Sequence, residues 1–301
     1  WPQPEYLKEA LKKLDFYVNA EIFMSESSYA ADLVLPACTS YEREQVHVGG
    51  GGRFFFSNQA IQPVGEGKND IEIIMDVFKR MKLQDHTLED EILEGGYEAY
   101  MEHILEPSGL TLEELKSHPE GTSGKNLILP QVRTYEKEPF HTPSGKVEFK
   151  SLVLERYRDS HGYDGLPVYR DFREDPAVDR KEYPLILNTG SRKPQLFHSR
   201  LYRMSWLKNI EAVPLVEIHP EDAERYGVKE GDTVKVASPA GEIQGTIAYN
   251  IQGQPGIVYI YHGNAQGDAN ELIGRDYLDP ISGFPGFKGY FCRIEKAGKD
   301  V

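Results

Sequence analysis

The C-terminal part of the chain, from residue 181 onward, contains six short β-type segments, and this series constrains the fold most strongly. The segments are residues 184–189, 214–218, 233–237, 243–249, 257–261 and 290–294. Turn residues separate them, and one short helix interrupts them, with Pro220 suited to its first turn and Gly227 to its end. Six short strands with one helix predict a small closed barrel, because closure leaves no strand edge exposed.

The first of these segments changes character at its end. Leu185, Ile186 and Leu187 form an apolar run typical of a covered strand, and residues 188–191 break it. The residues that follow include six potential hydrogen-bond donors: Arg192, Lys193, His198, Ser199, Arg200 and Arg203. A donor-rich loop at a strand end predicts an anion site. The alternative is a solvated loop whose cations pair with nearby carboxylates, and the residues alone leave both interpretations open.

Composition excludes several classes of partner. The chain has 301 residues, enough for two domains with cores of their own, and a formal net charge of -14. This charge argues against nucleic acid and anionic lipid, because both bind basic surfaces. No run approaches the roughly 20 apolar residues of a membrane-spanning helix, so we expect no direct membrane insertion.

Only two cysteines, Cys38 and Cys292, are present, and they lie far apart in no CxxC pattern. This excludes a cysteine-ligated iron–sulfur cluster within the chain and makes a disulfide framework improbable. The chain begins with Trp1 and shows neither an initiator Met nor the apolar core of a signal peptide. We therefore expect it to be a fragment of a longer protein or a processed product.

Residues 1–84 have the pattern of an α/β unit. Two short β-type runs, residues 16–18 and 33–36, flank a stretch of small residues, which predicts a strand, a helix and a strand with parallel pairing. The glycines at 49–52 match neither phosphate-loop motif and open no helix, so they predict a hairpin or loop tip. Arg53 at its end could still reach a ligand.

A clear helix is expected from Asp70, which would cap it. Its apolar stripe, predicted to be core, comprises Ile71, Ile74, Met75, Phe78 and Met81. Residues 85–180 are less regular and richer in charge, Pro and Gly, although residues 111–114 form a capping box. We expect this middle part to be an irregular connecting region rather than a compact domain.

Residues 214–249 resemble the C-terminal cofactor-binding domain of the molybdopterin oxidoreductase superfamily, the group that includes dimethyl sulfoxide reductase and formate dehydrogenase. The matching positions are Pro220, Asp222, Ala223, Gly227, Val228, Gly231, Asp232 and Gly241. The resemblance implies a mainly β double-psi β-barrel domain over residues 181–301. Residues 31–36, 60–66 and 140–146, with Glu42 and Arg53, are similar to landmarks of the same family. They imply that residues 1–84 are an α/β remnant of a Rossmann-like domain.

The cofactor signal of this family lies on both sides of the barrel motif. Residues 189–192 and 197–199 resemble the loop and the following His-Ser element that line the pterin and its phosphates, and residues near 270 and 288 resemble the family's terminal elements. Ile273 departs from the usual Thr. By this resemblance the cofactor-binding residues are Thr189, Gly190, Ser191, Arg192, Phe197, His198, Ser199, His262, Asn270 and Lys288. These types suit a pyrophosphate and a polar fused ring.

The resemblance implies the C-terminal cofactor-binding portion of a molybdenum or tungsten oxidoreductase that uses molybdopterin guanine dinucleotide. In that family the protein ligand to the metal and any iron–sulfur motif lie upstream, so the chain alone should be inactive. The upstream domains of the same polypeptide are the implied partners, and an iron–sulfur electron-transfer subunit is a further one. The location of the parent enzyme, cytoplasmic or periplasmic, depends on residues before Trp1.

Two alternatives remain open. Residues 189–200, the His262-Gly263 pair and the Phe291-Cys292-Arg293 ending look closest to the acetylene hydratase-like branch, although Asn264 stands where that branch often has Trp. The parent protein could therefore be a non-redox hydratase. The other alternative is a cofactor-free β-barrel that serves as a binding module.

Overall fold

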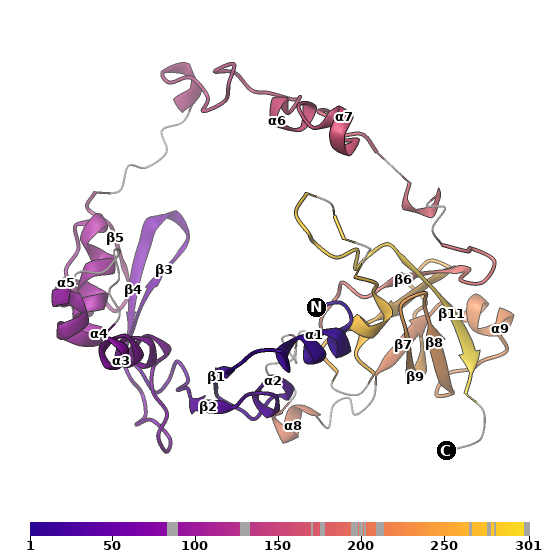
Figure 1. Cartoon of the computed structure of the whole chain (residues 1–301), viewed down its shortest axis with the longest axis horizontal. Helices are drawn as coiled ribbons and strands as arrows, with labels where there is room; N and C mark the ends of the chain where they lie inside the picture. The colour runs from indigo at the N-terminus through magenta and orange to yellow at the C-terminus, as the bar shows by residue number, and fades with distance from the viewer. Residues whose placement is uncertain are drawn as a thin grey trace. The chain divides into compact units, whose positions relative to one another are not determined.

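The computed structural model describes most of the chain and divides it into two compact units. The described residues are 1–82, 90–126, 133–169, 171–174, 178–193, 198, 201, 203–208, 214–264, 267–275, 278–279 and 281–297. One unit comprises residues 1–14 and 169–301, and the other comprises residues 15–168 (Figure 1). The first unit carries the predicted site residues.

The first unit is built on a closed barrel, as predicted. Its strands are β6 (Leu185–Asn188), β7 (Leu215–Ile218), β8 (Thr233–Ala237), β9 (Glu242–Tyr249), β10 (Ile257–Ile260) and β11 (Tyr290–Lys296). They close in the order β10-β6-β11-β8-β9-β7. The β10–β6 and β7–β9 pairs are parallel, and the other four pairs are antiparallel. The double-psi crossing of this barrel stays a prediction.

Alternating apolar side chains fill the barrel. Leu187, Val216, Val234 and Val258 are fully buried, as expected where one face of each strand points inward. At Gly245 in β9, an added Cβ would lie 2.6 Å from Val216 Cγ2 and 2.9 Å from the Pro214 carbonyl oxygen. Only glycine therefore fits at this position of β9, beside the start of its parallel partner β7.

The single helix of the strand series, α9 (Pro220–Arg225), forms as predicted. The His219 side chain accepts from the Glu221 N–H at 3.3 Å, and the buried Asp222 carboxylate accepts from the Gly256 N–H at 2.6 Å. This bond joins the helix to the turn before β10. Helix α8 (Ser205–Lys208) lies between β6 and β7 in the chain.

The N-terminal helix α1 (Pro4–Leu11) belongs with the barrel rather than with the α/β part that follows it. The Gln3 N–H donates to the Asn270 carbonyl oxygen at 3.0 Å, on the 3-10 helix η5 (Ala269–Leu272). The Arg275 guanidinium lies 3.5 Å from the centroid of the Tyr6 ring. The compact units therefore divide at residue 14, inside the predicted 1–84 region.

In the second unit, β1 (Val18–Glu21), α2 (Glu26–Tyr29) and β2 (Leu33–Pro36) form in the predicted order. The two strands pair in parallel, with Val18 opposite Leu33, which confirms the predicted pairing. A Rossmann-like origin for this remnant stays a prediction.

The glycines at 49–52 lie at a hairpin tip, as predicted. The hairpin consists of β3 (Gln45–Val48), η1 (Gly50–Gly52) and β4 (Arg53–Ser57), and β5 (Thr122–Ser123) pairs with β4. The Arg53 guanidinium donates to the carbonyl oxygens of Glu120 and Gly121 at 3.0 and 3.1 Å. Arg53 therefore has a structural role in this unit.

Part of the predicted irregular region is instead a folded cover for this hairpin. Helices α4 (Asp90–Leu105), η2 (Glu106–Ser108) and α5 (Leu112–Lys116) bring buried Leu105 and Leu115 against Phe54 and Phe56. The predicted capping box of α5 is present at Thr111 and Glu114. The remaining helices of this region are short: η3 (Thr134–Glu136), α6 (Leu152–Glu155), α7 (Arg158–His161) and η4 (Phe172–Glu174).

Helix α3 (Asp70–Met81) forms, but two expectations about it are wrong. Its cap is Asn69, whose side chain accepts from the Ile71 N–H at 3.0 Å. Of the expected core stripe, Met75 is buried, whereas Ile74 is 52% and Met81 63% exposed. Periodicity predicts a face that can be covered, and this unit covers only part of it. None of the described helices combines the length and hydrophobicity needed to cross a bilayer.

Candidate functional site

The loop after β6 is held from its first residue. Thr189 is buried, and its N–H and hydroxyl both donate to the Phe287 carbonyl oxygen, at 2.8 and 3.3 Å. The Gly190 N–H donates to Asn188 Oδ1 at 3.3 Å. These bonds turn the chain out of the strand and fix its path beside the segment that ends at Lys288.

Gly190 and Lys288 meet directly. A Cβ added to Gly190 would lie 2.8 Å from Lys288 Cγ and 2.9 Å from Lys288 Cε, so the lysine side chain crosses the glycine backbone. Two predicted site residues, 98 positions apart in sequence, are therefore adjacent. Any side chain at position 190 would therefore collide with Lys288, which favours glycine there.

Arg192, His198 and His262 form a hydrogen-bonded chain. Arg192 Nη1 lies 2.5 Å from His198 Nε2, and His198 Nδ1 lies 2.7 Å from His262 Nε2. His262 Nδ1 lies 3.2 Å from the Thr189 carbonyl oxygen. The chain starts at a group that only donates and ends at one that only accepts. Every bond must therefore run in one direction, which assigns a neutral ring with its proton on Nδ1 to both histidines.

The backbone supports this chain. The His262 N–H donates to the Ser191 carbonyl oxygen at 3.3 Å, and Arg192 and His262 form an isolated parallel bridge. His198 has φ +66°, in the left-handed region that few residues other than glycine adopt. Its ring lies 4.9 Å from the His262 ring, centroid to centroid. The loop thus adopts an unfavourable backbone angle where it places His198 against His262.

A second cation lies beneath the loop. Lys193 is buried, with its Nζ 5.0 Å from the centroid of the Tyr261 ring. Burial lowers the pKa of Lys193, and the negative charge of Glu217 acts in the opposite direction. Arg192, Lys193 and Lys288 therefore gather positive charge at one end of β6, in a chain whose net charge is -14.

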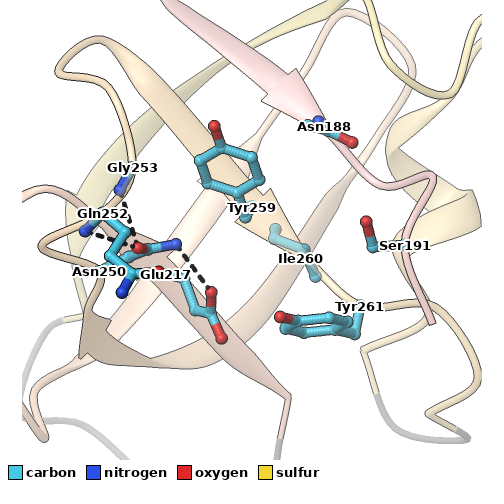
Figure 2. Close-up of a pocket in the computed structure, with 9 residues that line it drawn as sticks. All are labelled: Asn188, Ser191, Glu217, Asn250, Gln252, Gly253, Tyr259, Ile260 and Tyr261. Carbon is cyan, nitrogen blue, oxygen red and sulfur yellow. Dashed lines mark hydrogen bonds between the residues drawn. The ribbon is translucent and has the colours of Figure 1, made fainter. Parts of the chain in front are cut away.

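A cavity of about 280 Å³ adjoins this loop on the outside of the barrel (Figure 2). Its lining residues are Asn188, Ser191, Glu217, Asn250, Gln252, Gly253, Tyr259, Ile260 and Tyr261. Of these, only Ser191 belongs to the predicted site. The alternation of Tyr259 and Tyr261 with buried Val258 and Ile260 is a signal that could have placed both tyrosines on one face of a strand.

The cavity contains one carboxylate, that of Glu217. Asn250 Nδ2 donates to Glu217 Oε2 at 3.1 Å. The pKa of Tyr261 is raised, first by burial, then by the charge of Glu217 and by a hydrogen bond between the two side chains. Glu217 is therefore held from two sides.

The structure does not join every predicted residue to the loop. Asn270 lies on η5, where its N–H donates to the Asp268 carboxylate at 2.9 Å, and no hydrogen bond within the described part of the chain links it to the β6 loop. Phe197 and Ser199 lie outside the described residues. In the part of the chain that is described, no group of three or more His, Cys, Asp or Glu side chains is arranged to hold a metal ion.

This arrangement fits an anionic ligand with a diphosphate. A guanidinium has five N–H donors in a planar fork that matches phosphate oxygens, so the bond to His198 is compatible with phosphate binding. Gly190 allows close approach of the backbone, and Lys288 lies over it.

Two family models match the chain. The model described as "Molydopterin dinucleotide binding domain" matches residues 185–291, which span all but the end of the barrel. The model described as "Molybdopterin oxidoreductase" matches residues 2–80.

Relatives with assigned names agree with these matches. Acetylene hydratase of Syntrophotalea acetylenica is 30% identical over 94% of this chain and 40% of its own length. Dopamine dehydroxylase of Eggerthella lenta is 27% identical over 96% of this chain and 36% of its own length. The F420-dependent formate dehydrogenase subunit alpha of Methanocaldococcus jannaschii is 26% identical over 98% of this chain and 41% of its own length.

The solved structure of acetylene hydratase from Pelobacter acetylenicus matches with a TM-score of 0.84 and 26% identity, over 99% of this chain and 42% of that one. The chain thus spans about two fifths of the length of these relatives. By these matches, residues 2–80 belong to the molybdopterin oxidoreductase family and residues 185–291 to the molybdopterin dinucleotide-binding domain family.

Proposed function

We propose that the chain is the C-terminal, cofactor-binding portion of a molybdenum or tungsten oxidoreductase, and that its β6 loop binds the diphosphate of molybdopterin guanine dinucleotide. The observation that carries this proposal is the hydrogen-bonded chain from Arg192 through His198 and His262 to the Thr189 carbonyl oxygen. This chain orients the guanidinium of Arg192, two residues after Gly190, whose backbone packs against the Lys288 side chain.

The bound cofactor would supply the oxo-transfer or two-electron chemistry through its metal. The residues of this chain would bind and orient it. Arg192 and Lys288 would pair with phosphate oxygens, Gly190 would let the backbone approach them, and the neutral His198 would keep the guanidinium in position. The side chains of Ser191 and Asn270 are further candidates for polar contacts with the pterin.

The metal ligand would come from outside this chain. Cys292 is fully buried and Cys38 is 5% exposed, and burial raises the pKa of both thiols. Metals bind the thiolate form, which burial disfavours. The chain is therefore expected to be inactive without the domains that its longer relatives possess, and an iron–sulfur cluster or electron-transfer subunit would join through those domains.

The test is the cofactor content of the complete protein, expressed anaerobically. Pterin, guanine nucleotide and metal should co-purify with the wild-type protein, and Arg192→Gln should lower all three in parallel. Arg80→Gln is the matched control, because Arg80 is exposed at the end of α3. Full occupancy in the Arg192→Gln protein would contradict the role proposed for Arg192, and a wild-type protein without pterin would favour a cofactor-free binding module.

A non-redox hydratase is the second candidate, favoured by the similarity to acetylene hydratase over 94% of the chain. The two candidates differ in their need for electrons. Turnover of an unsaturated substrate by the complete protein without any electron acceptor would support the hydratase, whereas turnover that depends on an acceptor would support the oxidoreductase.

A further inference from the structure

A tight turn carries two exposed apolar side chains just before the segment that adjoins the β6 loop. The turn comprises residues 281–285, and Asp279 holds it from the preceding side. Ile281 is 60% and Phe284 63% exposed. One exposed apolar residue is ordinary on a protein surface, but two on one short turn call for an explanation.

Hydrogen bonds fix the shape of this turn. The Asp279 carboxylate accepts from the N–H groups of Ile281 and Ser282, at 3.1 and 2.7 Å, and from the Ser282 hydroxyl at 2.8 Å. The Asp279 N–H donates to the Phe284 carbonyl oxygen at 2.8 Å. Gly283 has φ +68°, which a glycine adopts without strain. The turn therefore holds its two apolar side chains in solvent, and binding them would cost little conformational entropy.

The 281–285 turn is connected to the loop after β6. The Phe284 ring meets the Phe287 ring edge to face, with their centroids 5.7 Å apart. Phe287 packs against the barrel core, and its carbonyl oxygen accepts from the N–H and the hydroxyl of Thr189. The next residue is Lys288, which crosses Gly190. Phe284 is therefore one ring contact away from the residue that fixes the β6 loop.

The occupant of this apolar turn can be argued from the proposed cofactor. The chain spans about two fifths of the length of its relatives, and burial disfavours the thiolate form of both its cysteines. If the β6 loop holds the diphosphate, the metal ligand must reach the cofactor from another part of a longer protein. That part must face the end of the barrel where the β6 loop lies, and the 281–285 turn is attached at this end.

We propose that the 281–285 turn is a docking element for the upstream domain that supplies the metal ligand, and that Ile281 and Phe284 insert into an apolar pocket of that domain. The inference rests on the proposed function, because it requires a longer protein with its cofactor at the β6 loop. Rigid aromatic anchors that lose their water on binding are typical of the residues that dominate an interface. Docking here would cover the segment that carries Lys288, so cofactor release would require the two domains to separate.

The first experiment compares hydroxyl-radical labelling of side chains in the 301-residue chain and in the longer protein proposed above, both at the same low concentration. Ile281 and Phe284 should be labelled readily in the chain, because both are exposed. Their labelling rates should fall severalfold in the longer protein. Ile251, an exposed residue between β9 and β10, is the control and should be labelled at the same rate in both.

Variants separate docking from cofactor binding. Ile281→Ser should leave the pyrophosphate affinity and the free energy of unfolding of the chain unchanged, because the side chain is exposed. In the longer protein, the same change should raise the rate of pterin release by about tenfold or more, the usual effect of removing an interface anchor. Ile251→Ser should release pterin at the wild-type rate. Phe284→Ser should act as Ile281→Ser does, and Ile281→Ser keeps the test valid if loss of the Phe287 contact destabilises the Phe284 variant.

Equal labelling of Ile281 and Phe284 in the two proteins would overturn the inference. If the longer protein nevertheless held pterin, the proposed function would stand without this docking element. Protection of both residues in a longer protein that contains no pterin would support docking by the turn and contradict the proposed function. Labelling that falls in the chain alone as its concentration rises would assign the turn to a contact between two copies, which would also overturn the inference.

Discussion

One guanidinium determines where the protons lie along the loop after β6. Because Arg192 only donates, His198 must accept on Nε2 and carry its proton on Nδ1, and His262 must do the same. We predict that ¹⁵N imidazole shifts at neutral pH will show the Nδ1–H tautomer for both rings. An Nε2–H tautomer at His198 in the wild type would contradict the chain.

Glu42 is one of the carboxylates that make the stability of the second unit depend on pH. Its carboxylate accepts from the Thr39 and Val64 N–H groups, both at 2.6 Å, and these bonds, that of Thr39 first, lower the pKa of Glu42 below its ordinary value of 4.5. An unfolded chain binds the proton more readily, so the stabilisation is complete above the ordinary pKa and is lost as the pH falls through the lowered one.

Urea unfolding between about pH 3 and pH 6 measures this effect. The wild type should lose stability on the acid side of this range, and Glu42→Gln should flatten the loss. Glu66→Gln, at an exposed glutamate nearby, should retain the wild-type slope. A slope that Glu42→Gln leaves unchanged would assign the acid sensitivity to other carboxylates.

At the scale of elements, the close pairing of β7 with β9 depends on Gly245. A methyl group there would meet Val216 Cγ2 and the Pro214 carbonyl oxygen, and the carbonyl is backbone that cannot move aside easily. We predict that Gly245→Ala lowers the free energy of unfolding by about 1–3 kcal/mol, the usual effect of overpacking. Gly50→Ala is the control, because nothing lies within 4 Å of its added Cβ. Equal thermal midpoints for both variants would contradict this close approach at Gly245.

The barrel strands could be predicted because residue alternation and turn residues are local signals, as at β8 and β9. The order of the strands could not be predicted, because the parallel pairing of β6 with β10 joins residues 71 positions apart, such as Ile186 and Ile257. The cover of the hairpin by α4 and α5 was missed for a related reason. Leu105 and Leu115 reveal their common partner, Phe54, only once the chain has folded.

Part of the candidate site could be predicted from the sequence, and part of it could not. Thr189, Gly190, Arg192, His262 and Lys288 were predicted by family resemblance, and the structure brings them together around one loop. The cavity residues were missed because Glu217, Asn250 and Tyr261 come from three separate segments. Alternation can place Tyr261 on one face of its strand, but no local signal indicates that it meets Glu217 and Asn250. Their convergence depends on the register of β7 with β9 and β10.

At the scale of the whole molecule, α3 carries an apolar face that this chain leaves partly uncovered. Ile74 is 52% exposed, so Ile74→Lys should change the free energy of unfolding of the chain by no more than about 0.5 kcal/mol. In a longer protein of the kind proposed above, the same change should destabilise the assembly if further domains cover the helix. Met75→Lys, at a buried position of the helix, should destabilise the chain itself. Equal effects of Ile74→Lys in both contexts would contradict a cover by those domains.

The most direct test of the account is the affinity of the chain for inorganic pyrophosphate at low and high salt. If the β6 loop holds a diphosphate, the wild type should bind pyrophosphate, and its affinity should fall as the salt concentration rises. Arg192→Gln should lower the affinity at low salt by about tenfold or more, whereas Arg80→Gln should have the affinity of the wild type. Identical affinities for all three proteins would contradict the assignment of the β6 loop as the diphosphate site.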